Sequence, residues 1–234
     1  MWIKICGNTN LEDARFAAEC GANAVGFVFA PSPRQVDAGL VRQITGKLPR
    51  QVEKYGVFVD AEFDQIVSTV NACGLTGVQL HRSPDAGLPL RLRERFAQLP
   101  DRLSILRVLH YKALEFDQEL VELSRDHAVD AVLVDSSTAR AVGGTGASFH
   151  WLGAQSSFLR AAPHLRLIAA GGLAPENVKQ AIHTLRPWGV DVVSGVESVP
   201  GKKDPARVLA FIRSAQQAAA EILETPIQQA NVGR

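Results

Sequence analysis

Short apolar runs rich in β-branched residues alternate with longer amphipathic stretches along this chain. The apolar runs indicate eight strands, which begin near residues 2, 24, 53, 77, 103, 131, 166 and 189. Between them lie helical patterns, several opened by Asn, Asp or Pro, as at the start of a helix. The clearest predicted helices cover residues 11–20, 62–73, 113–127, 175–185 and 205–223. Strands that alternate with helices in this way predict a parallel sheet.

Eight βα units favour a closed barrel over an open sheet. The junctions at residues 19–26 and 72–79 look alike, each with a helix end, a glycine suited to a left-handed cap and a strand. A doubly wound open sheet normally has fewer strands and a glycine-rich first turn, whereas residues 6–10 carry no dinucleotide fingerprint. We therefore predict an α/β fold, a single-domain (β/α)8 TIM barrel over residues 1–224. The polar residues 225–234 are predicted to be a disordered tail.

Composition and charge narrow the class of protein. Of 234 residues 46% are hydrophobic and 21% charged, with a formal charge of +1, which describes a globule with a large core. A net charge this close to zero does not favour binding to nucleic acid or to a membrane surface. The sequence also contains neither a signal-peptide pattern nor an apolar run long enough to span a membrane. Cys6, Cys20 and Cys73 are odd in number and lack C-x-x-C spacing, which argues against disulfides and zinc. We expect a cytoplasmic protein.

Cys6 and Asp135 each close an apolar run and are the first candidates for proton transfer. They end residues 2–6 and 131–135. The carboxyl ends of barrel strands meet at one mouth, so both side chains are expected to face the same cleft. Strand alternation puts Cys6 on the face of Lys4 and away from the neighbouring isoleucines, which is unusual for a structural thiol. A lone cysteine is nevertheless more often a small packing residue.

Glycines cluster after the sixth, seventh and eighth predicted strands. They let backbone N–H groups approach an anion, and the helix start after Gly172 adds about half a positive charge. The loops after strands seven and eight commonly bind phosphate in barrels. Any one cluster alone would suit a tight turn equally well, but their joint placement predicts a phosphate ester as substrate. The predicted contacts are Gly144, Gly171, Gly172, Ser194 and Gly195.

Residues 4–9, Lys-Ile-Cys-Gly-Asn-Thr, closely resemble the opening signature of the phosphoribosylanthranilate isomerase family of tryptophan biosynthesis. Further segments similar to family signatures follow in order, about one per strand end. They are GFVFAPSPR (26–34), GVFV (56–59), VQLH (78–81), VDS (134–136), GGTG (143–146), AGGL (170–173), PENV (175–178) and GVDVVSGVE (189–197). This ordered set spans the chain and is far more specific than any single glycine pattern.

The resemblance implies an Amadori rearrangement of N-(5-phosphoribosyl)anthranilate to 1-(2-carboxyphenylamino)-1-deoxyribulose 5-phosphate, with no metal and no organic cofactor. By analogy with the family, Asp135 is the general acid that protonates the ribose ring oxygen, and Cys6 is the general base that takes the C2 proton. A thiol suits this role because its reference pKa, about 8.5, lies near working pH. We expect the neighbouring Lys4 to favour the thiolate.

The resemblance also assigns residues that bind substrate. Arg34 occupies the position expected to hold the anthranilate carboxylate, where a planar guanidinium can bind both oxygens; the alternative is a solvated surface arginine. His81 and Asp191 lie at or near strand ends and either line the mouth or satisfy polar groups inside the barrel. Cys20 and Cys73 fall at helix ends and are predicted to pack.

Two rival functions stay open on the sequence. One is the histidine-pathway isomerase, which runs the same rearrangement with two aspartates; Cys6 in the base position argues against it. The other is a barrel that binds phosphate without catalysis, which the joint presence of Cys6, Asp135 and Arg34 argues against. In each case we expect a small phosphorylated molecule as partner, no nucleic acid, no membrane, and a monomer or homodimer.

Overall fold

A computed structural model describes residues 1–82, 85–98, 102–111, 115–135, 151–161 and 164–224. It contains a closed barrel of eight parallel strands, each hydrogen-bonded to its neighbour in chain order, with β8 returning to β1. The predicted strand starts are confirmed to within one residue. The strands are β1 (Trp2–Ile5), β2 (Ala24–Val28), β3 (Glu53–Val59), β4 (Gly77–Arg82), β5 (Ser104–His110), β6 (Ala131–Asp135), β7 (Arg166–Ala170) and β8 (Gly189–Val192).

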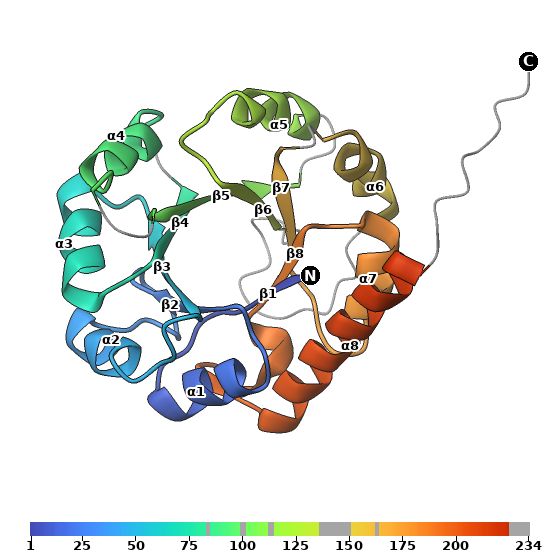
Figure 1. Ribbon diagram of the computed structural model, residues 1–234, viewed down its shortest axis with the longest axis horizontal. Coiled ribbons are helices and arrows are strands. Elements are labelled where there is room, and N and C mark those ends of the chain that lie inside the picture. The colour runs from blue at the N-terminus through green and yellow to red at the C-terminus, as the bar shows by residue number, and fades with distance from the viewer. Residues whose placement is uncertain (83–84, 99–101, 112–114, 136–150, 162–163, 225–234) are drawn as a thin grey trace, which may run out of the picture.

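Helices surround the barrel, as Figure 1 shows in a view along its axis. Asn10 and Asp37 cap α1 and α2 through their side chains, and Gly74 ends α3 in the left-handed conformation that its sequence position predicted. The helices are α1 (Leu11–Glu19), α2 (Ala38–Thr45), α3 (Phe63–Cys73), α4 (Leu88–Arg95), α5 (Phe116–Ser124), α6 (Trp151–Arg160), α7 (Val178–Leu185) and α8 (Pro205–Glu224). The predicted helices thus correspond to α1, α3, α5, α7 and α8, with shorter bounds for most.

Strand alternation divides the buried residues into two layers. Ile3 and Ile5 of β1 belong to the large cluster between barrel and helices. Trp2 belongs to a smaller cluster inside the barrel, together with Tyr55 and Leu133. The next residues on this inner face, Lys4 and then Cys6, are therefore directed along the barrel interior toward the carboxyl ends of the strands.

A short hairpin follows β8, which the sequence pattern did not predict. It contains a single turn of 3₁₀ helix, η1 (Ser194–Val196), and the antiparallel strands β9 (Glu197–Val199) and β10 (Lys202–Lys203). Its tip reaches the loop after β1, because the Thr9 hydroxyl donates to the Gly201 carbonyl at 2.5 Å. The hairpin thereby adds polar side chains to the edge of the barrel mouth.

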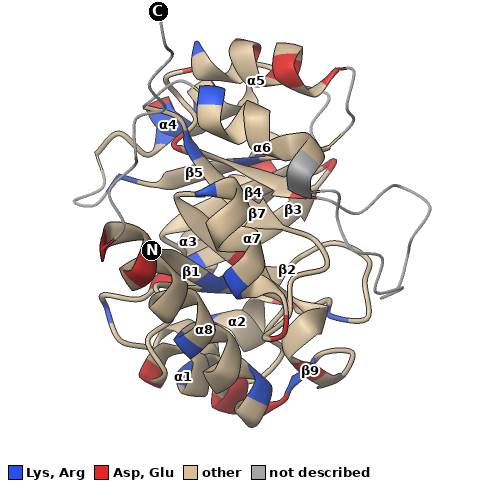
Figure 2. Cartoon of the chain, turned by 90° about the vertical axis from the view of Figure 1, so that its right-hand side faces the viewer, with Lys and Arg blue, Asp and Glu red and all other residues tan. Residues whose placement is uncertain are grey.

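Acidic and basic residues are interspersed over the length of the molecule (Figure 2). This distribution agrees with the formal charge of +1 for the whole chain. Among the described helices, none is both long enough and apolar enough to cross a membrane.

Candidate active site

The interior of the barrel holds a buried ion pair directly below Cys6. The Lys4 ammonium donates to Asp191 Oδ1 at 2.7 Å and to Gln79 Oε1 at 2.8 Å, and its side chain has no exposed surface. The positive charge of Lys4 acts on the neighbouring Cys6 thiol. Asp191 faces Lys4 across the β1–β8 pairing, so it satisfies a polar group inside the barrel, which is one of the two roles expected for it.

This environment sets the protonation of Cys6. Burial raises the pKa of the thiol above its ordinary value; the charge of Lys4 opposes that rise, Asp191 adds to it, and Lys203 opposes it. For Lys4, burial acts to lower the pKa, but Asp191 and Cys6 outweigh burial and hold the pKa above 10.5. Lys4 therefore favours the thiolate, as expected, yet burial has the larger effect on the thiol.

Cys6 is packed against the backbone of β2. A methyl group added at Gly26 would lie 2.5 Å from Cys6 Sγ and 3.1 Å from Lys4 Cε, so only glycine leaves room for the thiol at this position. Asn8 fixes the turn that follows, because its backbone N–H and its amide both donate to the Gly26 carbonyl, at 3.0 and 3.2 Å. The thiol is thus held between β1 and β2.

Asp135 ends β6 on the inner face of the barrel. Its strand neighbours on that face, Ala131 and Leu133, belong to the interior cluster, and its register partners are His110 on β5 and Ala170 on β7. His81 lies near the end of β4, and its ring meets that of His110 edge-on at 5.1 Å between centroids. The ends of β1, β4 and β6 therefore place Cys6, His81 and Asp135 toward the same end of the barrel.

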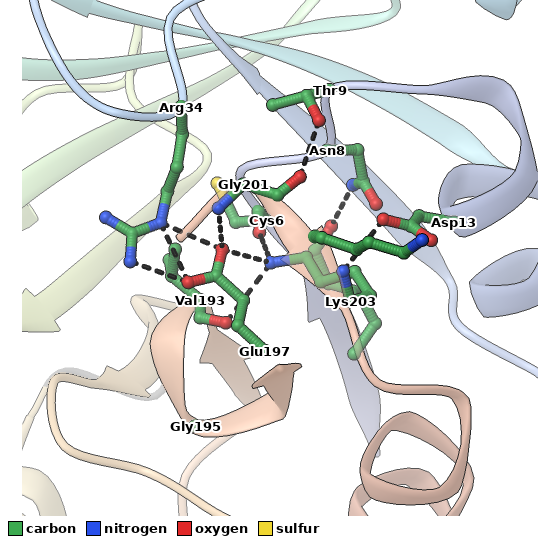
Figure 3. A network of polar contacts seen from close by, with 12 residues as sticks. Cys6, Asn8, Thr9, Asp13, Arg34, Val193, Gly195, Glu197, Gly201 and Lys203 are labelled. Atoms are coloured by element: carbon green, nitrogen blue, oxygen red, sulfur yellow. Dashed lines mark hydrogen bonds and ion pairs between the residues drawn. The ribbon is translucent and has the colours of Figure 1, made fainter. Parts of the chain in front are cut away.

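Arg34 lies beside this mouth and is held by a buried acidic residue. Its Nε donates to Glu197 Oε1 at 2.9 Å, and its Nη2 donates to Oε2 at 2.6 Å (Figure 3). Lys203 lies on the other side of Glu197, with Nζ 3.2 Å from Oε1, 2.6 Å from the Cys6 carbonyl and 3.1 Å from the Val193 carbonyl. Arg34 is therefore an anchored group rather than a solvated surface arginine.

Electrostatics keep this network ionised. Burial acts to raise the pKa of Glu197, but the hydrogen bonds and charges of Arg34 and Lys203 lower it below 4.5. The hydrogen bond to Glu197 raises the pKa of Arg34. Burial lowers the pKa of Lys203, and Glu197 opposes that change. With two cations and one anion, the network is left with an excess positive charge beside Cys6.

The loops after β7 and β8 touch one another where a phosphate group was predicted. Gly171 and Gly172 both have positive φ, 80° and 66°, which glycine adopts without strain. A methyl group at Gly195 would collide with the Leu173 carbonyl oxygen, so the two loops approach at backbone distance. Asn177, the N-cap of α7, donates to the Gly172 carbonyl at 2.9 Å. This geometry brings the Gly171–Gly172 turn, the loop after β8 and the start of α7 together at one place.

Some predictions fall outside this cluster or outside the described residues. Gly144 and the tail 225–234 belong to the parts of the chain that the structure does not describe. Cys20 is the C-cap of α1, and Cys73 ends α3 with its thiol 3.4 Å from the Ala38 carbonyl, so both lie at helix ends, where packing was predicted. The described residues include no group of three His, Cys, Asp or Glu side chains placed to hold a metal ion.

Sequence reasoning missed four residues that build the site. Gln79 and Gly26 stand inside segments that were recognised, but their roles depend on contacts to β1 from other strands. Glu197 ends the last recognised segment, five residues after β8, and its role depends on a contact to Arg34 from the other end of the sequence. Lys203 carried no signal, because a lysine in a polar turn normally lies in solvent.

The chain resembles known isomerases over nearly its whole length. The profile of the N-(5′-phosphoribosyl)anthranilate (PRA) isomerase family matches residues 3–214. A protein of Pelobacter propionicus named N-(5′-phosphoribosyl)anthranilate isomerase is 38% identical over 220 residues, which cover 94% of this chain and 97% of that protein.

Solved structures agree with the sequence matches. A phosphoribosyl anthranilate isomerase in complex with reduced 1-(o-carboxyphenylamino)-1-deoxyribulose 5-phosphate is 35% identical, with a TM-score of 0.75, over 93% of this chain and 99% of that one. Monomers generated from the dimeric isomerase of Thermotoga maritima give the same identity, TM-score and coverage. The match in fold thus extends over the barrel and its mouth.

Proposed function

We propose a residue-level mechanism for this chain, which belongs to the N-(5′-phosphoribosyl)anthranilate isomerase family and is an isomerase of tryptophan biosynthesis. Its substrate is N-(5-phosphoribosyl)anthranilate and its product is 1-(2-carboxyphenylamino)-1-deoxyribulose 5-phosphate. Family membership decides against the histidine-pathway isomerase and against a barrel that only binds. The mechanism is supported by a buried thiol directly after β1, beside a lysine, in a closed barrel whose sixth strand ends in an aspartate.

Asp135 acts first, as general acid. It protonates the ribose ring oxygen while the C1–O bond breaks, and the nitrogen lone pair forms the C=N bond of an open Schiff base. Its place at the end of β6, three strands around the barrel from β1, supports this assignment because acid and base then approach the sugar from different directions.

Cys6 acts second, as general base. The thiolate removes the proton from C2, and the electrons of the C2–H bond form the enolamine, which tautomerises to the ketone. Lys4 stabilises the thiolate form through its charge, while Asp191 and Gln79 hold the ammonium in place. Because burial leaves most of the thiol protonated near neutral pH, activity depends on the small thiolate fraction.

Two anchors orient the substrate at its ends. Arg34 binds the anthranilate carboxylate, and the backbone of Gly171, Gly172, Ser194 and Gly195 binds the phosphate. The bound ligand of the related isomerase carries both groups, which supports these roles. His81 lines the mouth between them, and Asp191 contributes through Lys4.

The remaining parts of the proposal concern the setting in which the enzyme works. We infer a cytoplasmic enzyme whose partner is a small phosphorylated molecule, and assembly as a monomer or homodimer. These two states are supported by the isomerase of Thermotoga maritima, which is dimeric and from which monomers have been generated.

Trapping of the open intermediate separates the two steps. Cys6→Ala should still open the ring with Asp135 but stop at the Schiff base, which cyanoborohydride reduces to a product identified by mass. Asp135→Asn should give little trapped product, although it binds the reduced product analogue as the native enzyme does. Near-normal turnover in either variant, or equal trapping in both, would refute the assigned roles.

A further inference from the structure

Glu197 occupies only one edge of the Arg34 guanidinium. It takes the Nε–H and one Nη2–H, in a side-on arrangement. None of the hydrogen bonds among the described residues uses Nη1, so the end-on edge formed by Nη1 and the second Nη2 hydrogen stays available. A planar carboxylate fits that edge with two parallel hydrogen bonds.

The stem of Arg34 is held as firmly as its head. A methyl group at Gly7 would lie 2.9 Å from Arg34 Cδ and 3.0 Å from Val193 Cγ1, so the arginine stem packs on the backbone that follows Cys6. The Arg34 side chain is 20% exposed and that of Glu197 is 4% exposed. The guanidinium therefore has one accessible edge and little freedom to rotate.

Glu197 is in turn held by Lys203, whose ammonium group has an acceptor for each of its three N–H bonds. Two of these acceptors are the carbonyls of the residues directly after β1 and β8, and the Lys203 backbone N–H donates to Asp13 at 2.8 Å. The hydrogen bonds thus form a continuous chain from the Cys6 carbonyl through Lys203 and Glu197 to Arg34 (Figure 3). Such a chain sets the distance between the guanidinium and the reacting thiol.

We propose that Glu197, held by Lys203, is a positioning residue that fixes Arg34 so that the enzyme selects ligands with a carboxylate on the aromatic ring. The inference rests on the proposed role of Arg34. Glu197 does not touch the ligand; it presents the end-on edge of the guanidinium at a set place. Without it Arg34 keeps its charge but loses its orientation, and the ligand carboxylate must then order a flexible side chain on binding.

Two ligands that differ only in this group test the proposal. The reduced product analogue and its counterpart without the ring carboxylate are titrated calorimetrically into the native enzyme, Glu197→Gln, Glu197→Asp and Arg34→Ala. Glu197→Asp keeps the negative charge, but its stem is one methylene shorter and cannot reach Nε and Nη2 at the present distances, so it guards against a folding defect in Glu197→Gln. Glu221→Gln removes an equally paired carboxylate on α8 and serves as the matched control.

The measured quantity is the affinity ratio between the two ligands. Both Glu197 variants should lower this ratio by roughly three- to tenfold, the cost of ordering one long side chain, with unchanged affinity for the ligand that lacks the carboxylate. Glu221→Gln should keep the native ratio. An unchanged or higher ratio in both Glu197 variants, or equal losses for both ligands, would overturn the positioning role alone. A native ratio retained in Arg34→Ala would overturn the assignment of Arg34 as well.

Discussion

Replacement of Gly26 by alanine should displace the Cys6 thiol without changing its chemistry. The new methyl carbon would lie 2.5 Å from Sγ, whereas non-bonded heavy atoms pack about 3.5–4.0 Å apart. The sulfur must therefore move by about 1 Å, because β2 is paired on both sides and cannot retreat. A misplacement of that size costs about 10²-fold in rate, and overpacking costs about 1–3 kcal/mol in the free energy of unfolding.

Kinetics and thermal melting measure the two effects separately. Steady-state assays of Gly26→Ala should show kcat reduced about 10²-fold with KM little changed, since neither ligand anchor moves. The melting temperature should fall by about 2–4 °C for each kcal/mol lost. Gly46→Ala is the matched control: Gly46 caps α2 with φ −63°, and a methyl group there would meet only the Arg42 carbonyl at 3.3 Å.

A double variant tests the geometry without any assay of activity. In a Cys6→Ala background the closest atom to the new methyl group is gone, so Gly26→Ala should destabilise the protein less, by at least about 0.5 kcal/mol, than it does in the native background. Additive losses of stability, or a folded Gly26→Ala enzyme with native kcat, would refute the position given to the thiol.

Three further predictions concern charge and phosphate. Since burial raises the pKa of Cys6 above 9.0 and only the thiolate accepts a proton, kcat/KM should rise with pH through a limb above about pH 9; a limb below pH 8 would contradict this reading. Lys4→Met should move that limb to higher pH and lower the free energy of unfolding by about 3–5 kcal/mol, because Asp191 loses its buried partner. Asp191→Asn should move the limb to lower pH, since Asp191 raises the pKa of Cys6. If pH–rate profiles shift in the same direction in both variants, the ion pair is not the cause. Gly195→Ala should weaken binding of the phosphorylated product analogue in calorimetry, because the methyl group collides with Leu173, and native affinity would exclude this loop from the phosphate site.

Much of the fold could be predicted from the sequence because most barrel strands are short runs in which apolar residues dominate. Their starts were found within one residue, and the left-handed cap at Gly74 followed from a glycine at a helix end. The helices α2, α4 and α6 were not singled out. In α4 and α6 the apolar face is short, and four of the five residues 91–95 of α4 are arginine or glutamate. The helical period of apolar residues is therefore weak in these two segments.

The site was predictable only where strand geometry determines it. Alternation along β1 placed Cys6 on the face of Lys4, and the barrel brought Asp135 to the same mouth. The sequence could not weigh burial against the charge of Lys4, because burial depends on the surrounding strands. Nor could it pair Arg34 with Glu197, which lies 163 positions away in a hairpin that polar residues made look solvent-exposed.

Conversion of N-(5-phosphoribosyl)anthranilate, followed as loss of anthranilate-type fluorescence, tests the central claim most directly. The native chain, Cys6→Ala and the control Cys20→Ala would be compared, each checked for binding of the reduced product analogue. The account predicts rapid conversion by the native chain and Cys20→Ala, and a loss of orders of magnitude in Cys6→Ala with binding retained. Rapid conversion by Cys6→Ala, or none by a native chain that binds the analogue, would contradict it.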